Sequence, residues 1–331
     1  MKPRTTRRPT LDLSLSVDEA IEAAEALWDT YDLAEDTGIE RYIAELADQC
    51  DAADVGTIGE LGEKASEIIK EWAHVTSLTA YTDRESAVHI NTARHTIHVL
   101  LLSAALHRRE DAAVLLAGLP SVVGRSTNKR RHLDGVEVLL LRLEALRRAL
   151  KGGAGARNAS QYVLVEVGAT TSEIEHVALA DFDNHERPHT IAFCGNGNDV
   201  GPRTRPLAPW ATHVMSLTLS EHVRMHGDAS DRPIAYYTDG ASNNPQAAAA
   251  VCTNLARAMI DLGIGKGPHR PEPHSILRWR LKAIRESQGI DAAVEASGRP
   301  SATALYTFLT MQEPRKSVAK RKKRLGSMLG Q

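Results

Sequence analysis

Apolar residues recur every three or four positions along much of the chain, which is the spacing of helices with one buried face. In the N-terminal part the runs that show this pattern are 17–50, about 86–107 and about 110–117. Thr57 and Glu60 have the spacing of a capping box, in which each side chain accepts a hydrogen bond from the other residue's backbone N–H. We therefore expect a helix from Thr57 through Trp72, and a helical structure for the first 120 residues.

The second half of the chain mixes helical and strand patterns. Asp134 is a favourable N-cap for a helix that ends at Gly152–Gly153. HTIAFCG and RTRPLA are strand-like, and the turn NGNDVG separates them, which predicts a β-hairpin. The other runs in this half predict helices over 160–168, 171–182, about 209–225, 245–262, 274–288, 290–297 and 301–311. The fold class is therefore mainly α with a small β-hairpin.

A break in the helical pattern divides the chain into domains. The stretch GLPSVVGRSTNKRRHL contains glycine, proline and serine and ends in the basic run Lys129–Arg130–Arg131, which is typical of an interdomain linker. The predicted parts are a basic flexible N-terminus (1–16), a helical domain with acidic first helices (17–120), a basic linker (121–133), an α+β domain (134–311) and a basic C-terminal tail (312–331).

Composition excludes several classes of protein. With 331 residues, of which 42% are apolar and 25% charged, the chain can bury sizeable cores. No apolar run approaches the roughly 18 residues of a membrane span, and no secretory signal is present. Cys50, Cys194 and Cys252 lack CxxC spacing, and the histidines lack HExxH spacing. We therefore expect a cytoplasmic protein with reduced thiols, no metal, no cofactor and no membrane partner.

The net charge of −2 conceals a separation of acidic and basic residues along the chain. Residues 11–70 are rich in aspartate and glutamate and contain only Arg41, Lys64 and Lys70 as basic residues. The basic clusters are Arg4, Arg7 and Arg8; Lys129, Arg130 and Arg131; Arg203 and Arg205; and the tail from Arg315 to Arg324. Several basic clusters in linkers and tails favour a polyanionic partner such as nucleic acid.

Five segments carry a recognisable order of motifs: HLDGVEVLLL (132–141), VGATTSEIEHVALADFD (167–183), SILRW (275–279), Gly298–Arg299 and YTFL (306–309). With the hairpin between the second and the third, they resemble the catalytic domain of the tyrosine recombinase (phage integrase) family. The resemblance covers about 134–311, and the N-terminal part only by its architecture. It implies a helical core-binding domain joined by a basic linker to a mostly helical catalytic domain, with double-stranded DNA as partner.

In that family a tyrosine attacks a DNA phosphodiester while two arginines, a lysine on the hairpin and histidines stabilise charge and transfer protons. A tyrosine, whose unperturbed pKa is about 10, needs such an electropositive environment to attack. The corresponding slots here hold Thr170 for the first arginine, Ser275 for the box histidine with His274 before it, Arg278 for the second arginine, Arg299 for the second histidine, and Tyr306. The hairpin turn offers Asn196, Asn198 and Arg203 but no lysine.

These substitutions predict a catalytically inactive member. Removing one preorganised donor typically costs about 10²–10³ in rate, so the loss of several leaves essentially no strand transfer. Tyr306 is then a packed helix residue. The alternative is a weak cleavage activity that Arg203, Arg205 and His274 rescue.

DNA contacts are still expected, because lysine and arginine contacts to phosphates supply most of the affinity. We expect the helix over 84–98 to enter a major groove. The candidate DNA-binding residues are Arg84, Asn91, Arg94, His95, His98, Lys129, Arg130, Arg131, Arg203, Arg205, His274, Arg278, Arg280, Lys282, Arg299, Lys320, Arg321, Lys322, Lys323 and Arg324. The tail either grips DNA or docks on a second copy of the chain, and the acidic helices either receive the tail or shield the DNA-binding face.

The resulting hypothesis is a sequence-specific DNA-binding protein on an inactive tyrosine-recombinase scaffold. Its expected role is transcriptional repression, for example phage or mobile-element immunity, in a bacterial nucleoid or encoded by a bacteriophage. The alternatives are an active, divergent recombinase and an architectural or accessory recombination factor that bends DNA.

Overall fold

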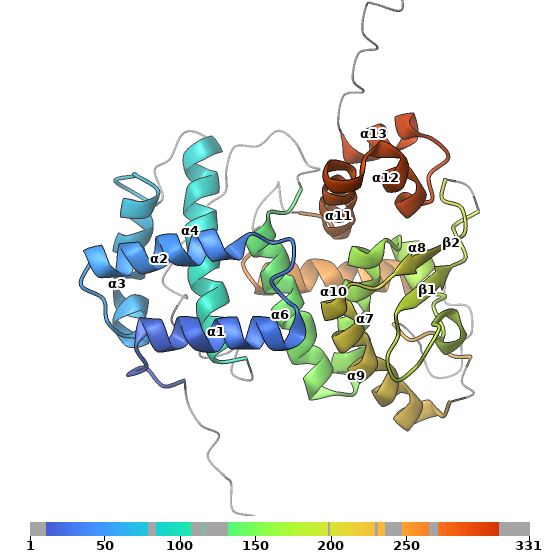
Figure 1. Ribbon diagram of the computed structural model, residues 1–331, viewed down its shortest axis with the longest axis horizontal. Helices are drawn as coiled ribbons and strands as arrows, with labels where there is room; N and C mark the ends of the chain where they lie inside the picture. Colours follow the sequence, from blue (N-terminus) through green and yellow to red (C-terminus); the bar gives the residue numbers. More distant parts are fainter. Residues whose placement is uncertain are drawn as a thin grey trace, which may run out of the picture.

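The computed structural model describes residues 11–78, 84–106, 115, 132–197, 199–228, 231–235, 247–264 and 271–310. Over these residues the fold is mainly α-helical with one two-stranded antiparallel sheet, as the sequence predicts (Figure 1). The helices are α1 (Val17–Tyr31), α2 (Ile39–Ala52), α3 (Ile58–Trp72), α4 (Arg84–Ala104), α6 (Gly135–Lys151), α7 (Ala154–Val167), α8 (Thr171–Ile174), α9 (Pro209–His226), α10 (Ala247–Asp261), α11 (Pro273–Gln288), α12 (Ile290–Ser297) and α13 (Ala302–Leu309). The helix expected over 110–117 and the linker run Lys129–Arg131 lie outside the described residues, except for Leu115.

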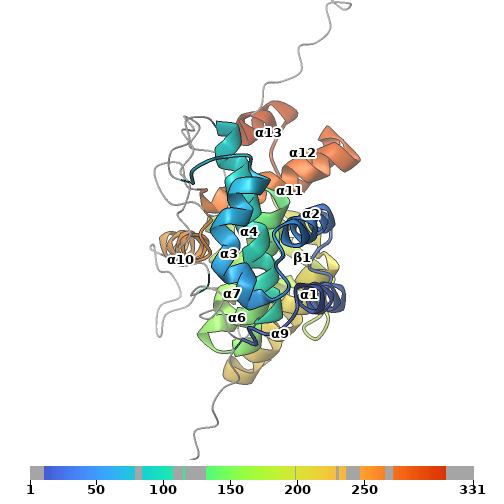
Figure 2. The ribbon, with the colours of Figure 1, turned by 90° about the vertical axis from the view of Figure 1, so that its left-hand side faces the viewer.

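Helices α1 and α3 begin at capping boxes. The Glu60 N–H donates to the Thr57 hydroxyl over 3.2 Å, and the Thr57 N–H donates to the Glu60 carboxylate over 3.0 Å, as predicted for the start of α3. Ser16 and Glu19 cap α1 in the same way. The helices α1, α2 and α3 all pack against α4 (Figure 2). Trp28 of α1 is buried and donates its indole N–H to the Ser103 hydroxyl of α4 over 2.9 Å.

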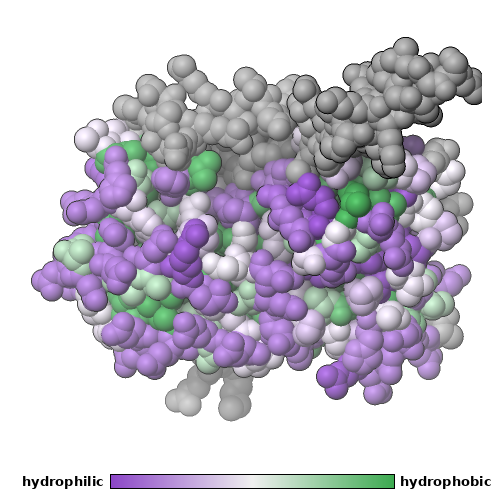
Figure 3. All heavy atoms as spheres, turned by 45° about the horizontal axis from the view of Figure 1, so that its top comes forward, coloured by the Kyte–Doolittle hydropathy of each residue, from purple (hydrophilic) through white to green (hydrophobic). Residues whose placement is uncertain are grey.

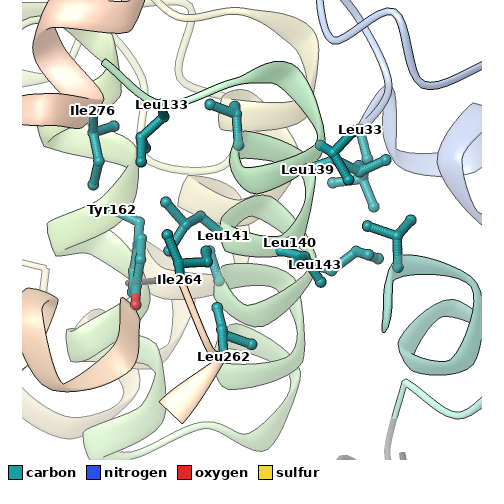
Figure 4. Packing of buried hydrophobic residues seen from close by; sticks show 14 of the residues in the cluster. Leu33, Leu133, Leu139, Leu140, Leu141, Leu143, Tyr162, Leu262, Ile264 and Ile276 are labelled. Carbon is teal, nitrogen blue, oxygen red and sulfur yellow. The ribbon is translucent and has the colours of Figure 1, made fainter. Parts of the chain in front are cut away.

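Helix α6 connects the two halves of the protein. Asp134 caps it as expected, accepting the Glu137 N–H over 2.8 Å. Apart from the exposed Leu150 near its end, its leucines and valines are buried around its circumference, because α4 packs on one side and α7 and α9 on others. Figure 4 shows Leu139 beside Leu33 of the N-terminal half, and Leu141 toward Tyr162 on the opposite side. One continuous cluster of buried residues therefore runs through both halves.

The predicted hairpin is present. Strands β1 (Thr190–Phe193) and β2 (Arg203–Pro206) pair antiparallel, with Ile191 opposite Arg205. The helix expected over 171–182 is wrong, because α8 ends at Ile174 and only a short 3-10 turn follows at Leu179–Asp181. Tertiary packing overrides the local pattern there, since Phe182 forms a β-bridge with Ile191 and is buried against the hairpin.

A buried arginine fastens the loop between α1 and α2 to the second half. Arg142 of α6 is 1% exposed, and its Nη1 donates to the carbonyl oxygens of Leu33 and Glu35 over 2.7 and 2.6 Å. Its Nη2 donates to Glu166 Oε1 of α7 over 2.6 Å. The guanidinium therefore holds backbone from the N-terminal half and a carboxylate from the C-terminal half at the same time.

Aromatic and ionic contacts surround this arginine. Its Cζ lies 4.9 Å from the ring centroid of Trp210 on α9 and 5.6 Å from that of Trp279 on α11. At the edge of the same interface Asp36 pairs with Arg280 over 2.9 Å, and Asp32 lies 3.2 Å from His213 Nε2. The loop is therefore fixed to α6, α9 and α11.

Candidate functional site

A cavity of about 380 Å³ lies where several of the resemblance's motifs meet. Its walls come from the start of α8, the hairpin turn, the start of α11, the α12–α13 connection and α13. The lining residues are Thr170, Thr171, Ser172, Asn196, Asp199, Val200, Glu272, His274, Arg278, Arg299 and Phe308. Three motif slots, Thr170, Arg278 and Arg299, are therefore brought together from segments far apart in the sequence.

Arg278 is the retained arginine, and it is held tightly. Its side chain is 4% exposed, and its Nε donates to the Phe308 carbonyl oxygen over 3.1 Å. Its Nη2 lies 3.8 Å from the Glu272 carboxylate. Ser275, one turn earlier on the same helix, is fully buried, and its hydroxyl accepts the Glu272 N–H over 3.1 Å. Ser275 therefore stabilises the start of α11 and does not line the cavity.

Phe308 forms an aromatic wall of the cavity. The Arg299 guanidinium lies 4.0 Å from its ring centroid and that of Arg278 lies 5.1 Å from it, both within the range of cation–π attraction. The His274 ring contacts the same phenyl ring edge-on, with centroids 6.0 Å apart. Sequence reasoning missed Phe308, which stands two positions after the tyrosine in YTFL.

Tyr306 is not among the residues that line the cavity. An α-helix turns about 100° per residue, so Tyr306 and Phe308 point about 200° apart around α13. Because the Phe308 ring contacts the cavity's arginines, Tyr306 lies on the other side of the helix, where it is half-buried. The cavity therefore brings together Thr170, Arg278 and Arg299, which stand at the family's positions for the first arginine, the second arginine and the second histidine. Tyr306, at the position of the tyrosine, does not line it.

Thr170, at the position of the family's first arginine, takes part in a buried hydrogen-bond network. Thr170 is 8% exposed and donates its hydroxyl to Glu173 Oε2 over 2.9 Å. Arg203 binds the same carboxylate through both Nη atoms, over 2.7 and 2.9 Å, and also donates to the Gly168 carbonyl oxygen over 2.6 Å. The Arg203 side chain is 5% exposed. These partners hold Arg203 inside the protein, and its expected contact with DNA stays a prediction.

The charges that line the cavity cancel. Arg278 and Arg299 face two carboxylates, Asp199 and Glu272, which sequence reasoning did not identify. Burial lowers the pKa of His274, and the nearby Arg278 lowers it further against the opposite effect of Glu272, so the imidazole is neutral at pH 7. Burial also lowers the pKa of the Arg299 guanidinium, although that of an arginine remains far above neutrality. The formal charge of the lining is therefore zero at pH 7.

The helix expected to enter a major groove turns its basic residues inward. Arg94, His95 and His98 of α4 are 8%, 1% and 5% exposed. Arg94 Nη1 donates to the Gly263 carbonyl oxygen over 3.3 Å, and His95 Nε2 lies 3.2 Å from the same oxygen. This face of α4 packs on the segment after α10, and the expected DNA contacts of these three residues stay a prediction. Asn91 is half-buried, and the side chain of Arg84 lies outside the described residues.

The remaining basic candidates lie closer to the surface. Arg205 is half-buried, and burial lowers the pKa of its guanidinium, with smaller contributions from nearby Arg280 and Arg203. Arg280 pairs with Asp36, and Lys282, 42% exposed, lies 3.9 Å from Glu286. Lys129, Arg130, Arg131 and the tail residues Lys320, Arg321, Lys322, Lys323 and Arg324 lie outside the described residues.

No protein-family model matches the sequence, and no curated protein matches it. None of the described helices is long and apolar enough to cross a membrane.

Three solved structures illustrate what the fold is similar to. The crystal structure of XerA recombinase is 12% identical, with a TM-score of 0.44, over 92% of this chain and 98% of that one. A lambda integrase dimer bound to a COC' core site is 14% identical, with a TM-score of 0.39, over 88% and 96%. The integrase from mycobacterium phage Brujita is 15% identical, with a TM-score of 0.32, over 91% and 98%. At these values the fold is similar to those of tyrosine recombinases and integrases.

Proposed function

We propose that this chain is a double-stranded DNA-binding protein that does not transfer DNA strands, and that it acts as a sequence-specific transcriptional repressor. The observation that carries the proposal is the composition of the cavity. Motif positions that resemble those of a strand-transferring site converge there, but Phe308 lines the cavity and Tyr306 does not.

The electrostatics of the cavity also argue against strand transfer. Attack on a phosphodiester builds negative charge, which must be met by preorganised cations and proton donors. Here Asp199 and Glu272 neutralise the two arginines of the lining, and Thr170 stands in place of a further arginine. Each lost donor costs about 10²–10³ in rate, so the combined losses leave no measurable reaction.

Charge separation limits where a duplex can bind. Residues 11–78, which contain α1 to α3, hold eighteen aspartates and glutamates but only three lysines and arginines. Repulsion of phosphates by this surface directs DNA to the basic parts of the chain, namely Lys129–Arg131, the tail and the middle of α11 at Arg280 and Lys282. Figure 3 shows hydrophilic residues over most of one face, with hydrophobic residues in small separate patches, which suits a polar partner.

Mapping of the DNA sites bound by the full chain tests this proposal. A repressor is expected to occupy sites over promoters, and a footprint of the best site defines its operator. Binding at a single attachment locus would instead favour an active recombinase. Weak sequence preference with a large bend would favour an architectural factor.

The salt dependence of binding tests the charge argument. The affinity of the wild-type chain for its best site is expected to fall steeply and linearly on logarithmic axes as salt increases. Replacing Lys129, Arg130 and Arg131 by glutamine should reduce the slope by about one per phosphate contact removed. A slope unchanged by this substitution would show that the linker run makes no phosphate contacts.

A further inference from the structure

Two arginines from different elements meet at a second, smaller pocket, away from the cavity described above. Arg205 of β2 and Arg280 of α11 both line this pocket, together with Trp210 at the start of α9. The volume of the pocket is about 10 Å³, which is room for about one water molecule. It is therefore too small to enclose a ligand, and its two guanidiniums are suited to a ligand that approaches from outside.

The guanidinium of Arg205 has spare hydrogen-bonding capacity. Within the part of the chain that the structure describes, no carboxylate forms an ion pair with it, and its Nε donates to the Val167 carbonyl oxygen over a long 3.5 Å. Burial lowers the pKa of Arg205 most, and the positive charges of Arg280 and Arg203 lower it further against the opposite effect of Glu295. An anion that contacts both Arg205 and Arg280 would relieve the repulsion between them.

The two carboxylates nearest to this pocket are already paired with arginines. Glu166, which lines the pocket, is 6% exposed and accepts from Arg142 over 2.6 Å. Asp36 reaches the pocket's edge from the α1–α2 loop, where its Oδ2 accepts from Arg280 Nη1 over 2.9 Å. The side chains of Asp36 and Arg280 are 52% and 24% exposed, so this pair is open to solvent. Asp36 therefore occupies Arg280 at a place that an external anion can also reach.

The α1–α2 loop is fixed independently of the Asp36 carboxylate. Arg142 donates to two of its carbonyl oxygens, and Thr37 lies so close to Gly135 that a Cβ at position 135 would clash with the Thr37 carbonyl oxygen. Asp36 has a φ of 63°, in the left-handed region, which aspartate and asparagine adopt more readily than most other residues. The loop therefore presents the Asp36 carboxylate to Arg280 but does not depend on this ion pair for its shape.

We propose that Asp36 is an autoinhibitory residue, whose carboxylate competes with a DNA backbone phosphate for Arg280, and that the phosphate that displaces it is shared by Arg280 and Arg205. This inference rests on the proposed binding of duplex DNA, to which it adds an anion site and an internal competitor for that site. A guanidinium binds either a carboxylate or a phosphate through charge-assisted hydrogen bonds. Arg280 can therefore exchange one for the other while the loop stays in place.

The exposure of the ion pair sets the size of the effect. A solvent-exposed pair of this kind is weak, so Asp36 can reduce DNA affinity only modestly. We expect Asp36→Asn to strengthen binding by about twofold to fivefold. Asparagine has nearly the same shape and tolerates the left-handed backbone, so the change removes the charge and leaves the loop intact.

Fluorescence anisotropy of the full chain with a labelled, mixed-sequence DNA duplex measures this effect. Such a duplex is a suitable probe because phosphate contacts carry no sequence information. Asp48→Asn is the matched control, because it removes the same charge from an exposed position of α2. Salt screens a charge that lies away from the contact, so the control should change the affinity by less than about 1.5-fold.

Two arginine variants identify the cations that are involved. Arg280→Gln and Arg205→Gln should each weaken binding and lower the salt slope by about one, as for the loss of one phosphate contact. Arg187→Gln, at an exposed position outside the pocket, should leave the slope unchanged. In the Arg280→Gln background, Asp36→Asn should have no more effect than Asp48→Asn, because the cation for which Asp36 competes is absent.

A gain of affinity for Asp36→Asn that requires Arg280 supports the inference. Equal effects of Asp36→Asn and Asp48→Asn would overturn it, and so would a gain that persists in Arg280→Gln or a salt slope that Arg205→Gln leaves unchanged. These outcomes leave the proposed function standing, whereas absence of duplex binding by every variant would contradict both proposals. Circular dichroism of each variant confirms that it is folded.

Discussion

Replacing Arg142 by methionine removes a buried side chain that binds both halves of the interface around the α1–α2 loop. The change leaves the Glu166 carboxylate, 6% exposed, without the cation that it contacts over 2.6 Å. It also removes the donor that the Leu33 and Glu35 carbonyl oxygens share. Breaking a buried ion pair from one side typically costs about 3–5 kcal/mol, because a buried charge is left uncompensated. We therefore expect Arg142→Met to lower the free energy of unfolding by about this amount.

Urea unfolding followed by circular dichroism measures this loss. Divided by the entropy of unfolding expected for 331 residues, a loss of about 3–5 kcal/mol corresponds to a drop in Tm of about 4–7 °C. Combining Arg142→Met with Glu166→Gln removes the uncompensated charge and should recover about 1–2 kcal/mol. Arg142→Lys should lie between wild type and Arg142→Met, because an ammonium cannot reach two carbonyls and a carboxylate in the fork geometry of a guanidinium.

Arg187→Met serves as the control for these variants, since Arg187 is exposed, and it should change the free energy of unfolding by less than about 0.5 kcal/mol. If Arg142→Met costs less than about 1 kcal/mol, or if the Glu166→Gln combination gives no recovery, then the buried ion pair does not fasten the interface in the way described.

Three further predictions concern other parts of the molecule. Arg203→Met should lower the free energy of unfolding by about 3 kcal/mol, because Arg203 is buried and paired with Glu173. It should leave the salt dependence of DNA binding unchanged, and a smaller slope would show that Arg203 contacts a phosphate. Burial, with smaller effects of His226 and Arg232, lowers the pKa of His222 to about 4, so the unfolded chain takes up this proton first as the pH falls. Urea unfolding should show that the wild-type chain loses stability between pH 7 and pH 4.5 and that His222→Gln loses less. An equal loss in the wild type and in His222→Gln would contradict the lowered pKa of His222. Burial, with smaller effects of the nearby Asp51 and Asp18 carboxylates, raises the pKa of the buried Cys50 thiol to about 11. The Cys194 thiol is exposed. Iodoacetamide at pH 8 should therefore label Cys194 in the native protein and leave Cys50 unlabelled, which mass spectrometry of peptides measures. Labelling of Cys50 without labelling of Cys194 would contradict this prediction.

Local signals in the sequence predicted most of the helices. The capping residues Thr57 and Asp134 lie at the N-termini of α3 and α6, because a cap depends only on a few neighbouring residues. The hairpin was also predicted, from two short strands and a glycine-rich turn. The extent of the helix after Thr170 was not, because its end depends on the bridge between Phe182 and Ile191, which the local pattern does not contain.

The orientation of helix faces could not be predicted from the sequence. Arg94 and His95 were expected to contact DNA, but in the structure both contact the Gly263 carbonyl oxygen, which is far away in the sequence. Periodicity locates the faces of a helix but does not say which neighbours pack against them. Arg142 gave one usable signal, since an arginine inside the apolar run VLLLRLEAL is expected to be buried and therefore paired.

The candidate site was predicted in part. The motifs identified Thr170, Arg278 and Arg299, which meet at the cavity. They did not identify Asp199, Glu272 or Phe308, because an alignment of slots ignores the residues between them. The direction of Tyr306 also required the structure, since only the contacts of Phe308 show which side of α13 faces the cavity.

Incubation of the full chain with a nicked duplex that carries its best binding site, followed by denaturing electrophoresis, tests the central claim most directly. Such a substrate traps any covalent phosphotyrosyl intermediate because the cleaved strand cannot be rejoined. We predict that the wild-type chain binds the duplex and forms no covalent adduct, so that it behaves like Tyr306→Phe. A covalent protein–DNA adduct that Tyr306→Phe abolishes would show that the tyrosine reaches the phosphate and would contradict the account.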